Sequence, residues 1–204
     1  MPKRYTMLLF AAALLSANAA EEGFTPLFNG SNLDGWVGNT KGYVASDGVL
    51  VCQAGKGKGG NIYTEQEYDN FVFRFEFKLT PGANNGVGIR APLSGAASKK
   101  AFEIQILDNS AEKYAKLQPT QYHGSVYKCA AAKRGHLKPV GEWNSEEIRA
   151  DGHHITVVLN GVTIVDRADV ERYKRPARGH IGFLGHGSHV EFRNIRVKQL
   201  EATE

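Results

Sequence analysis

Residues 102–108, with the sequence FEIQILD, combine polar and apolar side chains in a pattern that could support acid–base chemistry. In a strand the apolar side chains would face one way and Glu103 and Gln105 the other. Leu107 breaks this alternation. Because an extra residue is what a β-bulge inserts, a bulge here would turn Asp108 onto the face of Glu103 and Gln105. Two carboxylates beside an amide are suited to proton transfer at a glycosidic bond.

The same spacing also fits a solvated strand face that ends in a turn formed by Asp108 and Asn109. Other chemistry has less support. The glycine-rich loop 54–60 lacks the spacing of a phosphate-binding P-loop, no H-E-x-x-H pair suggests a metal site, and no G-x-S-x-G elbow is present. Acid–base chemistry and a simple turn therefore stay as the two interpretations of residues 102–108.

The dominant period along the chain is two, which indicates strands rather than helices. The clearest cases are the aromatic run 71–79 and the hairpin 154–165, whose Asn160-Gly161 turn tolerates positive φ at both positions. Further strands are expected at residues 49–53, 86–90, 102–107, 147–150, 180–184 and 190–198. Many short strands with polar turns predict an all-β fold, a two-sheet antiparallel sandwich.

The N-terminal residues predict export. Lys3 and Arg4 precede an apolar run at residues 7–15, which is too short for a transmembrane helix, and Ala17-Asn18-Ala19 fits the A-x-A cleavage pattern. We therefore expect a signal peptide at residues 1–19, one domain at residues 20–204, and a periplasmic or extracellular location, with no membrane attachment after cleavage. Loss of Lys3 and Arg4 halves the formal charge of +4, and the interspersed remaining charges suggest no nucleic-acid partner.

Two cysteines, Cys52 and Cys129, are too few for a disulfide-built scaffold. An oxidising compartment would nevertheless permit one bridge between them.

The chain resembles the 3-keto-disaccharide hydrolases, a family formerly catalogued as a domain of unknown function. The resemblance covers nearly all of the expected mature chain, and the ordered set of motifs carries it rather than any single one. The Glu103-Ile104-Gln105-Ile106-Leu107-Asp108 segment matches the family's E-[apolar]-Q-[apolar]-x-D motif. The other matching segments are FTPLFNG at 24–30, LDGW at 33–36, NNGVGIR at 84–90, GSVY at 124–127, GEWN at 141–144, NG at 160–161, GHIG at 179–182, HG at 186–187 and EFRNI at 191–195.

This resemblance implies a concanavalin-A-like jelly roll of two curved antiparallel sheets, whose concave face holds a carbohydrate substrate. It also implies a reaction on glycosides that carry a ketone at C3 of the sugar. Such a ketone acidifies the proton on C2, so the glycosidic bond can break by elimination and water can then add. One departure from the family is Leu184 in place of a usual Gln, which removes a polar contact near His186.

The elimination needs a base near C2, donors for the developing enolate oxygen and an acid for the leaving group. We expect Glu103 or Asp108 to be the base, with the other carboxylate or His186 as the acid. A divalent cation held by carboxylate and His could supply the electrophile, and the sequence leaves both this cofactor and the oligomeric state open.

Four further residues are candidates for substrate binding. Arg90 would polarise the ketone or hold the ring, Gln105 and Tyr127 would contact hydroxyl groups, and His123 lies just outside the matched GSVY stretch. We expect Arg90, Glu103, Gln105 and Tyr127 to share the concave face, with the apolar residues of 102–106 packed between the sheets.

Two other functions fit the same fold. A retaining glycosidase of the laminarinase type has a catalytic strand E-x-D-x-x-E, whereas this chain has Gln105 and Asp108 at the second and third acidic positions. A non-catalytic carbohydrate-binding module is the third alternative, because a fold does not imply an activity.

Overall fold

The computed structural model describes residues 21–55, 59–167 and 173–201, so the expected signal peptide at 1–19 lies outside the described residues. The strands are β1 Thr25–Pro26, β2 Trp36–Gly38, β3 Tyr43–Ser46, β4 Val49–Cys52, β5 Gly60–Tyr68, β6 Phe71–Leu79, β7 Asn84–Ala91, β8 Phe102–Leu107, β9 Trp143–Asp151, β10 His154–Leu159, β11 Val162–Arg167, β12 Gly179–Gly185 and β13 Val190–Gln199. The short helices are η1 Thr40–Gly42, α1 Ala97–Lys100, η2 Glu112–Tyr114 and η3 Pro119–Gln121. No helix among these described residues is long and apolar enough to cross a membrane.

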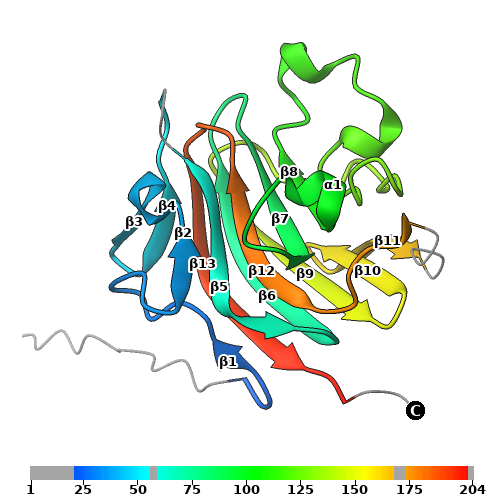
Figure 1. Ribbon diagram of the computed structural model, residues 1–204. Coiled ribbons are helices and arrows are strands. Elements are labelled where there is room, and N and C mark those ends of the chain that lie inside the picture. Colours follow the sequence, from blue (N-terminus) through cyan, green and yellow to red (C-terminus); the bar gives the residue numbers. More distant parts are fainter. Residues whose placement is uncertain (1–20, 56–58, 168–172, 202–204) are drawn as a thin grey trace, which may run out of the picture.

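The strands form two antiparallel sheets, which confirms the predicted all-β sandwich. The eight-stranded sheet has the order β11-β10-β9-β6-β13-β4-β3, with β1 paired to β13, and the five-stranded sheet has the order β2-β5-β12-β7-β8. Figure 1 shows the sheets layered against each other, with the green segment that follows β8 standing at one edge of the sandwich.

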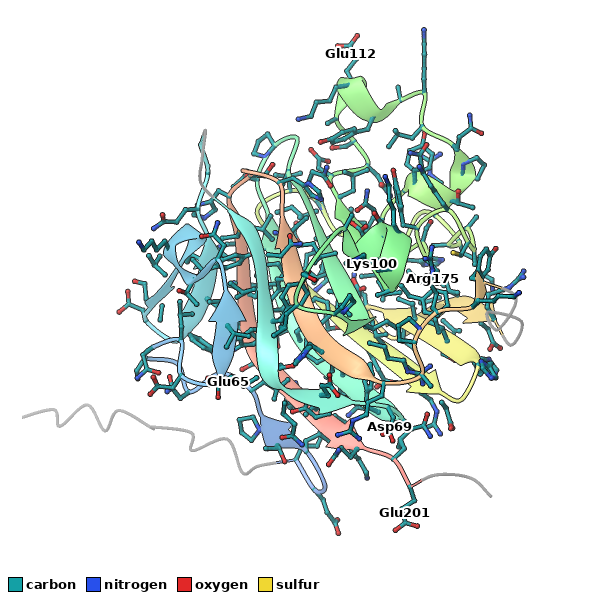
Figure 2. The ribbon with its side chains drawn as sticks, viewed as in Figure 1. Glu65, Asp69, Lys100, Glu112, Arg175 and Glu201 are labelled. Atoms are coloured by element: carbon teal, nitrogen blue, oxygen red, sulfur yellow. The ribbon has the colours of Figure 1, made fainter. Side chains whose placement is uncertain are left out.

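The core lies between the sheets, where the predicted alternation of the aromatic run holds. All four phenylalanines of β6, at positions 71, 73, 75 and 77, are buried. Across the core, Phe183 of β12 stacks on Phe192 of β13 with ring centroids 3.9 Å apart. Figure 2 shows side chains filling this space while the exposed, charged Glu65 and Glu112 lie at the periphery of the view.

The predicted hairpin of β10 and β11 is confirmed. Asn160 and Gly161 both have positive φ, 49° and 83°, and Leu159 pairs with Val162 across the turn. A two-residue turn of this kind matches the twist of its strands, and positive φ at both positions suits Asn-Gly.

The possible disulfide is not formed. Cys52 and Cys129, both within the described part of the chain, are not joined to each other. Cys52 is buried in the core at the end of β4, whereas Cys129 lies beyond the β8 edge of the other sheet.

Arg90 does not take the place predicted for it on the face of Glu103. Between Gly88 and Ala91, β7 contains one more residue than the facing stretch of β12, and Arg90 there has a φ of 52°. This bulge turns the guanidinium toward the strand turns, where it donates to Asp69 O and Gly152 O at 2.7 Å and to Asn70 Oδ1 at 3.1 Å. Burial lowers the Arg90 pKa, and the nearby Asp69 carboxylate opposes that effect.

We expect Arg90→Met to lower the free energy of unfolding by about 2–4 kcal/mol, because the three hydrogen bonds of a buried, charged side chain would be lost. Urea denaturation at pH 7 measures the change. Arg149→Met is the matched control, since Arg149 is 45% exposed and pairs with Asp151 at the surface, where such pairs contribute about 0–1 kcal/mol. Equal losses in the two variants would contradict the structural role of Arg90.

Candidate functional site

The outer face of β8 carries the polar residues predicted for a site. Phe102, Ile104 and Ile106 belong to the core between the sheets, so Glu103 and Gln105 point to the opposite face, and both are largely buried. The predicted alternation of apolar and polar side chains over residues 102–106 is confirmed.

The bulge predicted at Leu107 is absent. The β7–β8 ladder runs without a shift from Ile89 paired with Phe102 to Asn84 paired with Leu107, within these described strands. Beyond this ladder β8 simply ends.

Glu103 lies across the neighbouring strand because that strand has no side chain there. A Cβ added at Gly86 of β7 would meet Glu103 Oε1 at 2.6 Å, so the carboxylate occupies the space above this glycine. The side chain of Glu103 is 8% exposed. A residue with a Cβ at position 86 would therefore displace the carboxylate.

His186 follows β12 and approaches the same carboxylate. Its Nε2 lies 4.0 Å from Glu103 Oε1, and its side chain is 51% exposed, so one buried and one accessible ionisable group lie close together without a hydrogen bond. Tyr63 of β5 shares this face, and burial raises the pKa of its phenol, with the nearby Glu103 charge adding to the effect. Leu184 packs with Tyr63 and Ala97 in a small apolar cluster beside the pair.

Tyr127 joins the site from a segment that extends the sheet beyond β8. Ile104 bridges to Val126 in antiparallel register, and Tyr127 N donates to Glu103 O at 2.8 Å. Since residues opposite each other in such a pair share a face, Tyr127 lies next to Glu103.

The sequence interpretation did not identify Gln121, which contacts two predicted site residues. Its Nε2 donates to Tyr127 Oη at 3.1 Å, and its carbonyl accepts from Gln105 Nε2 at 3.4 Å. Gln121 precedes Tyr127 by six positions and sits in η3 rather than in a strand, so alternation could not have linked it to the site.

Asp108 is a turn residue, as the alternative interpretation held. Its Oδ2 accepts from Gly82 N at 2.7 Å, and its Oδ1 accepts from the Ser110 amide and hydroxyl at 2.9 and 2.5 Å. Burial alone would raise the Asp108 pKa, but these hydrogen bonds outweigh it and lower the pKa below the ordinary value. Both oxygens are therefore engaged in the turn, and Asp108 does not join Glu103 through a bulge as predicted.

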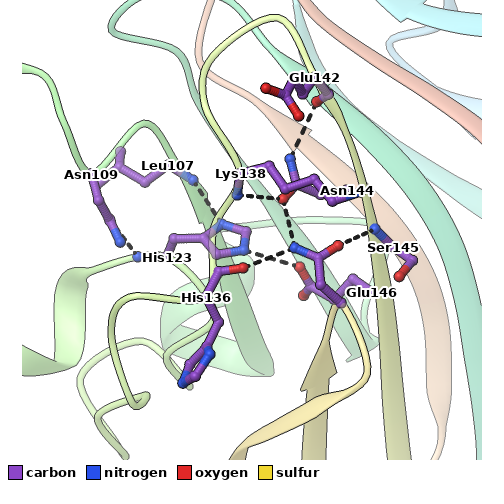
Figure 3. Close-up of polar contacts among 10 residues, drawn as sticks. Leu107, Asn109, His123, His136, Lys138, Glu142, Asn144, Ser145 and Glu146 are labelled. Atoms are coloured by element: carbon purple, nitrogen blue, oxygen red, sulfur yellow. Dashed lines mark hydrogen bonds and ion pairs between the residues drawn. The ribbon is translucent and has the colours of Figure 1, made fainter.

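His123 is buried inside the sandwich instead of lying on the face of Glu103. Its Nε2 lies 3.3 Å from Glu146 Oε2, and both side chains are at most 1% exposed (Figure 3). On the other side of the ring, Leu107 N donates to Nδ1 at 3.3 Å, and Asn109 Oδ1 accepts from His123 N at 2.9 Å. Instead of the predicted substrate contact, His123 makes contacts that connect β8, the segment after it and β9.

The side-chain positions bear on the divalent cation considered from the sequence. Within residues 21–55, 59–167 and 173–201, no three His, Cys, Asp or Glu side chains are grouped so that they could hold a metal ion. Glu103 and His186 together supply two such groups on the outer face.

Comparison with known proteins adds a family and a fold. The family model described as the 3-keto-alpha-glucoside-1,2-lyase-like domain matches residues 23–198. A 3-keto-disaccharide hydrolase of Bacteroides thetaiotaomicron is 27% identical over 88% of this chain and 79% of its own length.

Solved structures agree with this comparison. A candidate glycosyl hydrolase from Parabacteroides distasonis has a TM-score of 0.78 and 30% identity, and the match covers 87% of this chain and 99% of that one. A Bacillus subtilis protein with a galectin-like fold has a TM-score of 0.57 at 13% identity, over 79% of this chain and 87% of its own, which shows the shared sandwich alone.

For Asp108 we expect Asp108→Asn to lose about 1.5–3 kcal/mol of stability at pH 7, because its amide group would face donors that now bind a charged acceptor. A carboxyl with a lowered folded-state pKa contributes stability above its unfolded pKa and loses it as the pH falls through the folded pKa. The difference from the parent protein should therefore shrink below about pH 4. Urea denaturation from pH 7 to pH 3 tests this, with the exposed Asp34→Asn as control. A pH-independent difference would contradict it.

Proposed function

Because this chain belongs to the family of 3-keto-alpha-glucoside-1,2-lyase-like domains, we propose that it is a glycoside hydrolase that acts on sugars carrying a ketone at C3. The observation that carries the proposal is the buried Glu103 carboxylate above Gly86, with His186 Nε2 at 4.0 Å. A base and an acid side by side are what an elimination followed by hydration requires.

The reaction follows from the acidity of the C2 proton next to a ketone. The base removes this proton, and the C–H electrons form an enolate whose charge rests on the C3 oxygen. When the enolate collapses, the C1–O bond breaks and the leaving oxygen takes a proton from the acid. Water then adds across the C1–C2 double bond, with hydroxyl to C1 and a proton to C2, so the net change is hydrolysis.

In this scheme Glu103 is the base and His186 is the acid. Glu103 is shielded from solvent, which favours proton abstraction, whereas the exposed His186 can exchange protons with water. Gln105 and Tyr127 contact the sugar from the same face. Asp108, Arg90 and His123 support the fold around them, since their polar atoms bind neighbouring turns and strands.

We also propose that the protein is exported to the periplasm or beyond the cell. This rests on the basic and apolar residues 3–15 and the Ala17-Asn18-Ala19 pattern. N-terminal sequencing of the protein recovered from a periplasmic fraction should give a chain that begins at Ala20, and recovery of an intact Met1 chain in the cytoplasm would overturn the proposal.

The elimination predicts a specific isotope pattern. Turnover of a 3-keto-disaccharide in D₂O should place deuterium at C2 of the released keto-sugar, as measured by NMR, and the unoxidised disaccharide should be inert. Glu103→Gln keeps the shape but removes the base, so turnover should fall by about 10²–10⁴.

Two results would favour the alternatives. Cleavage of the unoxidised disaccharide without deuterium at C2 would indicate a conventional glycosidase. Binding of sugars without cleavage of either compound would indicate a carbohydrate-binding module.

The position of the carboxylate predicts a second effect. Gly86→Ala should keep the fold, because the added methyl meets the movable end of Glu103, but it should reduce turnover by roughly 10–100-fold through misplacement of the base. Gly88→Ala is the matched control, since its added Cβ meets only Leu184 Cδ2 at 3.3 Å and the Ala97 and Leu184 methyls at 3.5 Å. If the two variants lose turnover equally, the space above Gly86 does not position the base.

A further inference from the structure

The hydrogen bonds of Gln121 determine which way the Tyr127 hydroxyl points its proton. Gln118 N can only donate, and it lies 3.0 Å from Gln121 Oε1, so this side of the amide must be its oxygen. The amide nitrogen therefore faces Tyr127 Oη at 3.1 Å and donates to it. Since the phenol oxygen accepts this bond, its own proton is directed elsewhere.

Tyr127 is placed to offer that proton on the face of Glu103. It is only partly buried, and its backbone N donates to Glu103 O beside the antiparallel bridge of Ile104 and Val126, so its backbone lies next to that of Glu103. Directly opposed residues in such a pair have Cβ atoms about 5 Å apart. A base and a hydroxyl donor that rise from such neighbouring backbone positions can address a C2 proton and a C3 oxygen on adjacent carbons of one ring.

The orientation of the Gln105 side-chain amide is fixed in the same way. Its Nε2 donates to the Gln121 carbonyl, so Oε1 is the atom left to accept. That oxygen is buried and, among the described residues, has no hydrogen-bond partner. A buried unpaired acceptor is costly unless a ligand supplies a donor.

We infer that Tyr127 donates a hydrogen bond to the C3 oxygen as the enolate forms, that Gln105 Oε1 accepts from a neighbouring hydroxyl, and that Gln121 is the positioning residue for Tyr127. The inference rests on the proposed function and defines its substrate class more closely. The site takes a ring ketone with a hydroxyl on the next carbon, which presents an acceptor to Tyr127 and a donor to Gln105. The bond from Tyr127 strengthens as charge develops on the oxygen, which is how such donors accelerate reactions.

Gln121→Glu tests the direction of the Tyr127 proton with almost no change in shape. At pH 7 both oxygens of the introduced carboxylate accept, so one still binds Gln118 N and the other draws the Tyr127 proton away from the substrate. Turnover of the 3-keto-disaccharide should fall about 10²-fold, similar to the loss in Tyr127→Phe, with a smaller effect on KM. The double variant should lose no more than Tyr127→Phe alone, because both changes remove the same bond.

The pH profile separates this effect from a structural one. Protonation of the introduced carboxylate restores a donor for Tyr127 Oη, so turnover of Gln121→Glu relative to the parent protein should recover as the pH falls toward about 4.5. Lys128→Gln is the control for charge. It changes the net charge by the same amount, with Nζ 5.4 Å from the Tyr127 ring, but leaves the hydrogen bonds of Gln121 in place, so it should keep at least half of the parent turnover.

The outcomes distinguish the inference from the proposed function. If the parent protein does not release sugar from the ketone, the proposed function fails and the inference fails with it. If the parent protein is active and Tyr127→Phe retains its turnover, the inference alone is overturned, and this variant decides the matter even if thermal unfolding shows that Gln121→Glu is misfolded. A folded Gln121→Glu whose loss does not recover in acid would equally overturn it.

Discussion

The contact between the two sheets at Phe183 governs which residues can form a site. Phe183 stacks on Phe192 at 3.9 Å and on Trp36 at 5.7 Å, and it meets Phe75 edge to face. Aromatic packing of this kind fixes β12 in rotation as well as position, because a turned strand would move every side chain to the other face. The strands β7 and β8 follow β12 in the hydrogen-bonded sheet, so their side chains alternate in register with those of β12. Glu103 and Gln105 therefore point outward.

The site also depends on a segment that is not a regular strand. Residues 108–142 leave β8, turn at Asp108 and return along the β8 edge at residues 123–127. The buried pair of His123 and Glu146 holds this return against the eight-stranded sheet. Asn160 adds a second connection, because its Nδ2 donates to His136 O and to Asn144 Oδ1. Contacts made on the inner side of the sandwich therefore help to hold Tyr127 next to Glu103, and Gln121 next to Tyr127 and Gln105.

Hydrogen-bond satisfaction distinguishes Arg90 and Asp108 from Gln105. Arg90 and Asp108 bind partners within the chain through three donor atoms and both carboxylate oxygens respectively. Gln105, in contrast, keeps a buried oxygen without a partner among the described residues, and Glu103 Oε1 lies 4.0 Å from His186 Nε2, beyond hydrogen-bonding distance. Because an unpaired buried acceptor costs free energy, Gln105 Oε1 is a suitable partner for a donor on a ligand.

The sequence by itself determined the sandwich and the outward face of Glu103 and Gln105, because period-two alternation and an Asn-Gly turn are local properties that the backbone expresses directly. It did not reveal β5, whose exposed run at residues 65–67 breaks the alternation, and it placed the bulge at Leu107 instead of Arg90. Only the tertiary structure decided the roles of Arg90, Asp108 and His123 and the entry of Gln121 into the site. Their partners lie on other turns and strands, and burial against distant residues, which no local pattern records, determines whether a polar side chain is satisfied by the fold or left for a substrate.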